Sequence, residues 1–477
     1  MFKKNLKLSI GIMLVYFLLF SMIDKGYRDD YYRMIEGNFA WDTDGRPLAY
    51  LLVYIINSGG ILTDISPRSY IISAIVASIC CAIIGFKVLK STPAINLISA
   101  SLIFFSPFFL QNMSYKFDVV IMCTSILLCC LPYLYDDKNK YFVFLISSAC
   151  LIASLSTYQA SIPLFLMLNS LTLISQRFDK DACVNSIIRI VSFVFSLIFY
   201  TIAIARPLIA NDNAKHHSEI LLPVTHDAAN LFIKNIKDLF EVLGLIYNES
   251  NLLIFLPALC IASFCLVRML SKEKPSKLWV ASFIITSLSA LLSCFLFFIT
   301  KYPSYEVRSM IGFGSIAFFI TSIPVILLKR NNWMAYVACI PPLLFFTSIS
   351  NDYIVAAKSQ FKYEKQIVEL IYSDYKKLDG KGEIKVFGHF PFTNQAKTAF
   401  SKQPILKTFM RPDIPWWSGK YFFYAEYPLS KSIYIVTDWR FSRADNLTCD
   451  MKAISYNGIY TTFRENNNLV FVFTKKC

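Results

Sequence analysis

A succession of apolar runs, each close to the length that a membrane-spanning helix requires, dominates the first 350 residues of the chain. A spanning helix needs about 20 mostly apolar residues. Only 17% of the residues are charged, against about 25% in a typical soluble domain. The sequence therefore predicts an α-helical polytopic membrane protein with about eleven transmembrane helices. The predicted spans are residues 6–23, 70–85, 95–110, 119–134, 142–156, 162–174, 187–204, 252–270, 278–299, 310–328 and 334–348.

The first apolar run follows three lysines but is not followed by a small-residue cleavage site, which predicts a retained helix rather than a signal peptide. Lys and Arg near helix ends favour the cytoplasmic side. With the N-terminus in the cytoplasm, the predicted cytoplasmic turns are the basic ones and the opposite turns are not. The cytoplasmic set is Lys87, Lys90, Lys138, Lys140, Arg177, Lys180, Arg189, Arg268, Lys272, Lys274, Lys277, Lys329 and Arg330.

An odd number of spans then places the C-terminal region outside the cytoplasm. The predicted domains are a transmembrane module over residues 1–350 and a small α+β domain over 351–477. The module includes a first external loop at 24–47, a short helix at 48–56 and a larger external loop at 206–250 with an amphipathic helix at 228–245. In the C-terminal domain we expect a helix at 358–378 and strands at 383–387, 432–436, 459–463 and 469–473. Cys449 and Cys477 either pair as a disulfide there or stay reduced.

The first external loop carries an unusual density of charge and aromatic rings, RDDYYRMIEGNFAWDTDGRP over residues 28–47. Asp29 and Asp30 suit the first turn of a short helix, where acids cap backbone N–H groups. Capping explains one acid better than two, so the alternative is that one of them is a general base. Glu36 lies two helical turns beyond Asp29 and can face the same pocket. We therefore predict Asp29, Asp30 and Glu36 as catalytic candidates.

The predicted substrate-binding residues come from the same loop and from three short turns on its side of the membrane. Arg46 offers a planar fork for a phosphate, although an interfacial anchor is the alternative for each of these residues. Cations for phosphate, carboxylates and amides for hydroxyls, and aromatic faces for sugar rings together suit a sugar phosphate. The candidates are Arg33, Trp41, Asp44, Arg46, Lys116, Asp118, Tyr158, Gln159, Lys301, Tyr302, Glu306 and Arg308.

The sequence has no P-loop, no dinucleotide-binding fingerprint and no HExxH-type zinc motif. The formal charge of +15 falls mostly at the ends of apolar runs, which sets topology and does not indicate nucleic-acid binding. Most cysteines lie inside apolar runs, where packing is the expected role. We therefore expect neither a metal nor another cofactor.

The loop DDYYRMIEG…W…DGRPL, the TYQAS turn at residues 157–161 and the overall layout resemble the serotype-converting O-antigen glucosyltransferases of bacteria and phages, which are of the GT-C type. The resemblance implies a glucosyl donor on undecaprenyl phosphate, and O-antigen repeats of lipopolysaccharide as acceptor on the periplasmic side of the bacterial inner membrane. It also implies a donor synthase and a flippase as functional partners, and an essential acid in the first external loop.

A hypothetical mechanism follows, in which a loop carboxylate removes a proton from the acceptor hydroxyl as that hydroxyl attacks the anomeric carbon. A single inverting displacement requires one base. An O-antigen polymerase or ligase is the first alternative, because those enzymes also have a large external loop and residues 206–250 contain three histidines. A flippase or transporter is the second, but it would place charges within the spans and show an inverted repeat.

Overall fold

The computed structural model describes residues 1–135, 139–210, 212, 215, 219, 221, 225–273, 277–328, 332–410, 419–426, 435–438 and 452–473. Lys138, Lys274, Lys329, Arg330, Cys449 and Cys477 lie outside these residues. The chain divides into two compact units, and each is composed of segments from separate parts of the sequence. Unit 1 is Met1–Ser21, Phe39–Ser58 and Ile65–Asn351, and unit 2 is Met22–Asn38, Gly59–Asp64 and Asp352–Cys477.

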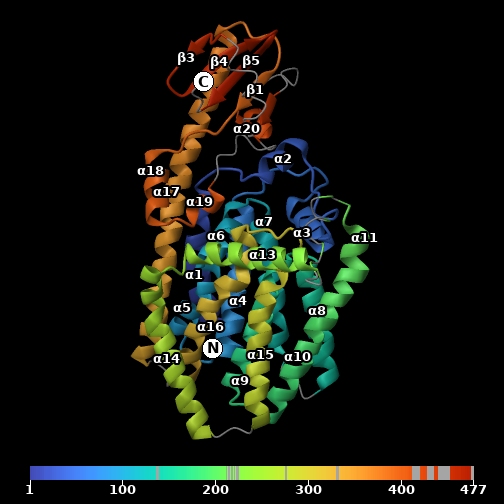
Figure 1. The fold of residues 1–477 in the computed structure, drawn as a ribbon. Helices are drawn as coiled ribbons and strands as arrows, with labels where there is room; N and C mark the ends of the chain where they lie inside the picture. The colour runs from blue at the N-terminus through green and yellow to red at the C-terminus, as the bar shows by residue number, and fades with distance from the viewer. Residues whose placement is uncertain are drawn as a thin grey trace. The chain divides into compact units, whose positions relative to one another are not determined.

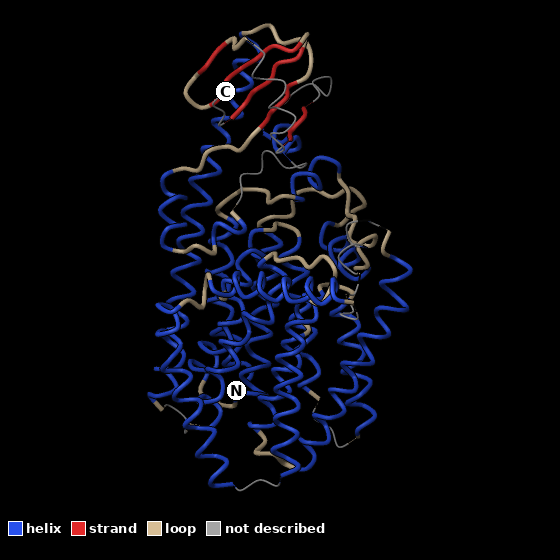
Figure 2. The backbone as a smooth tube through the Cα atoms, viewed as in Figure 1, coloured by secondary structure: helices blue, strands red, loops and turns tan. Residues whose placement is uncertain are grey.

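Unit 1 is built from helices (Figures 1 and 2), and six helical stretches in the described part of the chain are long and apolar enough to cross a membrane. This confirms the prediction of a helical membrane protein, while the number of eleven spans stays a prediction. The six stretches are α1 (Phe2–Ser21), α4 (Arg68–Ile83) with the π-helix η1 (Ile84–Leu89), α10 (Lys180–Phe199) with the π-helix η4 (Tyr200–Ala205) and α11 (Arg206–Leu208), α14 (Glu249–Glu273), α16 (Ile311–Leu327) and α17 (Trp333–Lys377).

Several apolar helices are shorter, and they match the predicted spans 119–134, 142–156, 162–174 and 278–299. They are α7 (Asp118–Cys130) with η2 (Leu131–Leu134), α8 (Lys140–Leu155), η3 (Gln159–Ser161) with α9 (Pro163–Ser175), and α15 (Lys277–Phe295) with η5 (Leu296–Phe298). The short helix expected after the first loop is α3 (Pro47–Asn57), which starts on a proline as helices favour. The expected amphipathic helix is α13 (His226–Gly244).

Residues 95–110, which the sequence predicts as one span, instead form two helices bent by 63° to each other. They are α5 (Pro93–Phe105) and α6 (Pro107–Ser114). Pro107 has no N–H for the helical ladder and excludes the helical conformation from the preceding residue. Ser106 is accordingly extended, and its hydroxyl accepts a hydrogen bond from the Phe108 N–H and caps α6. All eight residues of α6 are buried.

The predicted span 334–348 and the predicted helix 358–378 are a single helix of 45 residues, α17. The prediction of two separate helices is wrong because no glycine or proline falls between residues 349 and 357. Helix-compatible residues in that stretch let the hydrogen-bond ladder continue.

Unit 2 holds all the strands of the five-stranded sheet (Figure 2), whose order is β2-β1-β5-β4-β3. β1 lies parallel to both β2 and β5, whereas β3, β4 and β5 pair antiparallel. A small sheet near the C-terminus is therefore present, as predicted. The elements of unit 2 are α2 (Asp29–Glu36), the end of α17, β1 (Ile384–Phe387), α18 (Asn394–Lys402), α19 (Leu406–Phe409), α20 (Gly419–Glu426), β2 (Ile435–Asp438), β3 (Ser455–Tyr456), β4 (Tyr460–Glu465) and β5 (Asn468–Phe473).

The core of unit 2 explains why α2 belongs to it. Tyr31 of α2 is buried in the same hydrophobic cluster as Phe422 of α20 and Phe471 of β5. The rings of Tyr31 and Phe422 meet edge to face with their centroids 5.1 Å apart. Such aromatic pairs stabilise a core beyond the burial of their surface.

Candidate active site

The first external loop contributes to both units. Its first part, with Asp29, Asp30, Arg33 and Glu36, belongs to unit 2, and its second part, from Phe39 onward, belongs to unit 1.

The three predicted catalytic acids have different environments on α2. Asp30 is fully buried, and its Oδ2 accepts a hydrogen bond of 2.9 Å from the backbone N–H of Tyr27. Asp29 is half-buried and Glu36 is exposed at the last position of the helix. Asp30 therefore holds the backbone at Tyr27, just before α2, whereas the N-cap residue of α2 is Arg28 and has no side-chain cap. Arg33, in the last turn, is buried.

In unit 1, a tight turn at residues 41–46 brings Trp41 to the start of α7. The Arg46 N–H bonds to the Trp41 carbonyl, and Gly45 adopts a φ of +78°, which glycine tolerates best. The Trp41 indole then donates a hydrogen bond of 2.6 Å to Asp118 Oδ1, and both side chains are buried. Asp44 lies within this turn and is half-buried.

The turn 41–46 also packs on the TYQAS turn. The Arg46 guanidinium lies over the Tyr158 ring, 5.2 Å from its centroid. The N–H groups of Leu48 and Ala49 at the start of α3 both donate to the carbonyl of Ser156. These N–H groups have no partner within the helix, so the turn before α9 satisfies them.

Tyr200 of η4 joins the same two turns. Gln159 Nε2 donates to the Tyr200 hydroxyl over 2.6 Å, and that hydroxyl donates to the Gly45 carbonyl over 3.0 Å. The π-helical turn is a local irregularity that occurs often at functional sites.

Arg308, in the 3₁₀ turn η6 (Val307–Met310), is held by the side chains of two tyrosines and one glutamine. The Tyr158 hydroxyl donates to its carbonyl over 2.9 Å, and Gln111 Oε1 accepts from its N–H over 2.9 Å. Its Nη1 donates to the Tyr115 hydroxyl over 2.6 Å, with the guanidinium 4.9 Å from the Tyr115 ring centroid. Gln111 Nε2 also donates to Glu306 over 2.5 Å.

We call the residues that share these contacts the Arg308 cluster: Trp41, Arg46, Gln111, Tyr115, Asp118, Tyr158, Gln159, Tyr200, Glu306 and Arg308. Burial raises the pKa of the Tyr158 phenol, and the nearby Arg308 and Arg46 only partly offset that rise. The Tyr158 hydroxyl is therefore a permanent hydrogen-bond donor at neutral pH.

Lys301 and Tyr302 form a separate contact. The Lys301 ammonium lies 3.6 Å from the carboxylate of Glu219 and also over the Tyr302 ring. The backbone N–H of Lys301 donates to the backbone carbonyl of Glu219. The side chains of Lys301 and Glu219 are each 48% exposed, so this ion pair contributes little to stability. Lys116, between α6 and α7, is buried.

Gln111, Tyr115 and Tyr200 are the cluster members that the sequence does not predict. Gln111 directly follows the predicted span 95–110, Tyr200 lies inside an apolar run, and Tyr115 is an aromatic residue of the kind found at membrane interfaces. The pair Gln111-Asn112 just after Pro107 is the signal that could have revealed the site, because polar side chains within a span are often functional.

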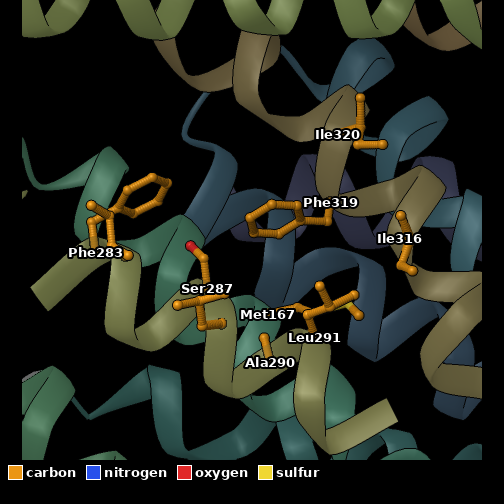
Figure 3. Close-up of a pocket in the computed structure, with 10 residues that line it drawn as sticks. Met167, Phe283, Ser287, Ala290, Leu291, Ile316, Phe319 and Ile320 are labelled. Carbon is orange, nitrogen blue, oxygen red and sulfur yellow. The ribbon is translucent and has the colours of Figure 1, made fainter. Parts of the chain in front are cut away.

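An apolar pocket of about 420 Å³ lies among α9, α15 and α16 (Figure 3). Its lining includes Met167, Phe283, Phe319 and Ile320, and the hydroxyl of Ser287 is the polar group among the labelled side chains. It offers no charge to a phosphate and few partners to a sugar, so the Arg308 cluster is the stronger candidate site.

The Arg308 cluster brings together two guanidinium groups, two carboxylates, two amides and several aromatic rings. Guanidinium groups bind phosphate oxygens, and amides and carboxylates bind hydroxyls. Among the residues that the structure describes, no three His, Cys, Asp or Glu side chains are grouped so that they could hold a metal ion.

A helical membrane fold with such a cluster suits a glycosyltransferase that acts at a membrane. The chain belongs to the family described as Glucosyl transferase GtrII, whose model matches residues 16–321. The resemblance seen in the first external loop and the TYQAS turn is thereby confirmed. The matched region contains the three acids on α2 and the whole Arg308 cluster, and it favours glucosyl transfer over the polymerase and transporter alternatives.

The chain is also similar to an uncharacterized 55.3 kDa protein in the gtrB 5′ region of Salmonella phage P22. The two are 25% identical over 419 residues, which cover 84% of this chain and 85% of the phage protein. No solved structure matches the chain.

Proposed function

We propose that this glucosyltransferase transfers glucose from undecaprenyl-phosphate-glucose to O-antigen repeat units on the periplasmic face of the bacterial inner membrane, and so changes the serotype. The family supports the glucosyl group. The similar protein from phage P22, whose description places it in the gtrB 5′ region, is in keeping with the phage-encoded enzymes that the sequence resembles. A donor synthase and a flippase supply the donor.

The observation that carries the proposal is the Arg308 cluster. Arg308 is fixed at its N–H, its carbonyl and its guanidinium. When the glycosidic bond breaks, the donor phosphate leaves as a monoester and gains negative charge. A preorganised guanidinium stabilises that charge better in the transition state than in the ground state. Arg46, stacked on Tyr158 in the same cluster, is the second phosphate ligand that we propose.

The reaction that we propose is a single displacement. The acceptor hydroxyl oxygen attacks the anomeric carbon, the bond from that carbon to the phosphate oxygen breaks, and a carboxylate takes the hydroxyl proton. Attack from the face opposite the phosphate inverts the anomeric configuration. Asp29, Asp30 and Glu36 are the proposed bases. Asp30 already accepts the Tyr27 N–H, which makes Asp29 and Glu36 the acids with the freer side chains.

The other proposed parts follow the sequence layout. From the sequence we propose a catalytic membrane module within residues 1–350, with its N-terminus in the cytoplasm, and a periplasmic domain built around residues 351–477. Residues 22–38 and 59–64 belong to the same compact unit as 352–477. Trp41, Asp44, Asp118, Tyr158, Gln159 and Glu306 would bind sugar hydroxyls and ring faces. Arg33, Lys116, Lys301 and Tyr302 are further substrate-binding candidates from the sequence. No step in this scheme requires a metal or another cofactor.

The test measures O-antigen glucosylation by mass spectrometry in cells that make the donor. We expect Arg308→Ala and one of Asp29→Asn, Asp30→Asn and Glu36→Gln to abolish it. Asp379→Asn changes a 79% exposed acid of unit 2 and is the matched control, expected to be fully active. Full activity of all three acid variants would refute the proposal that one of these acids is the base. Longer O-antigen chains without added glucose would point to a polymerase.

A further inference from the structure

We propose that Gln111 is a positioning residue whose side-chain amide sets Arg308 in the orientation that binds the donor phosphate. This inference rests on the proposed function of Arg308 and extends it to a residue that does not touch the substrate.

The two ends of the Gln111 amide contact two residues of the same short segment. Nε2 donates to Glu306 Oε2 over 2.5 Å, and Oε1 accepts from the Arg308 N–H over 2.9 Å. The side chain is fully buried. A carboxylate only accepts hydrogen bonds and a backbone N–H only donates one, so this arrangement needs a donor and an acceptor on one planar group. Glutamine provides that combination, and glutamate at neutral pH does not.

The break between α5 and α6 places Gln111 where it can act in this way. Pro107 starts a new helix direction at 63° to α5, and Gln111 lies one turn into α6. The chain after α6 then supplies Tyr115, whose hydroxyl accepts from Arg308 Nη1. The helix α6 and the residue that follows it therefore hold Arg308 at its backbone and at its guanidinium, respectively.

Glu306 completes the arrangement on the other side. Its carbonyl accepts from the N–H and the hydroxyl of Ser309, which closes the η6 turn around Arg308. With Gln111 attached to both Glu306 and Arg308, the turn cannot rotate without breaking two part-buried hydrogen bonds. A guanidinium held in this way loses little freedom when a phosphate binds.

The experiment compares steady-state kinetics of the purified full-length protein with synthetic undecaprenyl-phosphate-glucose and with lipid-linked O-antigen repeats from a strain that lacks the enzyme. In Gln111→Glu two carboxylates face each other, and we expect the donor KM to rise by about tenfold, the effect of about one charge-assisted hydrogen bond. The acceptor KM should change less than about twofold, because the substitution acts on the residue that binds the donor phosphate.

Two further variants keep the inference open to refutation. Asn169→Asp makes the same amide-to-carboxylate change in a fully buried side chain of α9 that bonds to Ser186, and it should leave the donor KM unchanged. Gln111→Asn introduces no charge but is too short to reach both partners. This variant should also raise the donor KM, and it provides the test if Gln111→Glu does not fold.

The outcomes separate this inference from the proposed function. If Arg308→Ala raises the donor KM and neither Gln111 variant does, the positioning role is refuted and the proposed function stands. A lower maximal rate with unchanged donor KM would show that Gln111 only supports folding. If Arg308→Ala itself leaves the donor KM unchanged, both the phosphate role of Arg308 and the inference fail.

Discussion

The Trp41 indole donates a hydrogen bond of 2.6 Å to the carboxylate of Asp118, and this contact joins the end of the first external loop to the start of α7. Trp41 is 0% exposed and Asp118 is 4% exposed. A buried carboxylate needs such donors, because desolvation without a hydrogen bond is costly. The second half of the loop is therefore part of the folded membrane unit and not a solvated excursion from it.

Trp41→Phe should destabilise the protein and lower its activity. The change removes a hydrogen bond to a charged group, which costs about 1.5–3 kcal/mol. Thermal unfolding in detergent and glucosylation in cells are the measurements. Trp333→Phe, at a position that is 70% exposed, is the matched control and should leave both unchanged. Equal behaviour of the two variants would show that the Trp41 contact does not support the site.

Tyr158→Phe should lower kcat/KM for the donor by about fivefold, because one neutral hydrogen bond contributes about 1 kcal/mol. The lost bond is the one to the Arg308 carbonyl, whereas the ring beneath Arg46 remains. Tyr133→Phe removes a comparable hydroxyl bond to the Phe165 carbonyl and should spare the donor kinetics.

A further prediction concerns the pH dependence of Tyr158→Phe. Burial raises the pKa of the Tyr158 phenol above the ordinary value of about 10. A raised phenol pKa means that folding favours the neutral form, so this stabilisation is complete below pH about 10 and decreases only above it. The ratio of wild-type to Tyr158→Phe activity should therefore stay constant between pH about 6 and 9. A step in that ratio within this range would contradict the burial of the hydroxyl.

Gly314→Ala should destabilise unit 1 at the break between α5 and α6. A Cβ at this position of α16 would collide with the Ser106 hydroxyl and lie 3.0 Å from Phe108 Cβ. Overpacking of this kind costs about 1–3 kcal/mol. The Tm should fall, and Ser106→Ala in the same chain should recover part of the loss. Gly11→Ala in α1 has no neighbour within 4 Å and should be neutral or slightly stabilising.

Lys25→Met should destabilise unit 2. The ammonium of Lys25 lies 2.9 Å from Glu364, whose side chain is 1% exposed. Removal of one partner from a buried ion pair costs about 3–5 kcal/mol. Limited proteolysis should cleave this variant faster than the wild type. Lys381→Met breaks an ion pair whose two side chains are 71% and 79% exposed, and it should have little effect.

Three exposed tyrosines provide a test of the predicted topology, namely Tyr135, Tyr302 and Tyr456. Each is changed to cysteine in a chain without other cysteines, and a membrane-impermeant maleimide is added to intact spheroplasts. We expect labelling at positions 302 and 456 and protection at position 135. Labelling of position 135 would refute the assignment of sides.

The apolar runs predict most helices of unit 1 because a bilayer accepts few other structures. They do not predict the bend at Ser106, because the sequence stays apolar across this point while the helical hydrogen-bond ladder stops at Pro107. They also give no sign that the first external loop divides after Asn38, because the residues on both sides are polar and aromatic.

The Arg308 cluster is predicted only in part for a related reason. Arg46, Tyr158, Gln159 and Arg308 stand out because they interrupt or border apolar runs. Gln111 and Tyr200 acquire their roles from partners 197 and 155 residues away, Arg308 and Gly45, and local patterns contain no information on such pairing.

The π-helical turn η4, which ends one of the long helices, carries Tyr200 to the carbonyl of Gly45. A π turn accommodates one more residue than the α turn that it replaces. Deletion of a single residue from Tyr200–Ala205 would therefore let this segment close into a regular α turn, and the displacement that brings Tyr200 to Gly45 would be lost. Insertions and deletions among descendants of a common gene should thus be selected against at this turn.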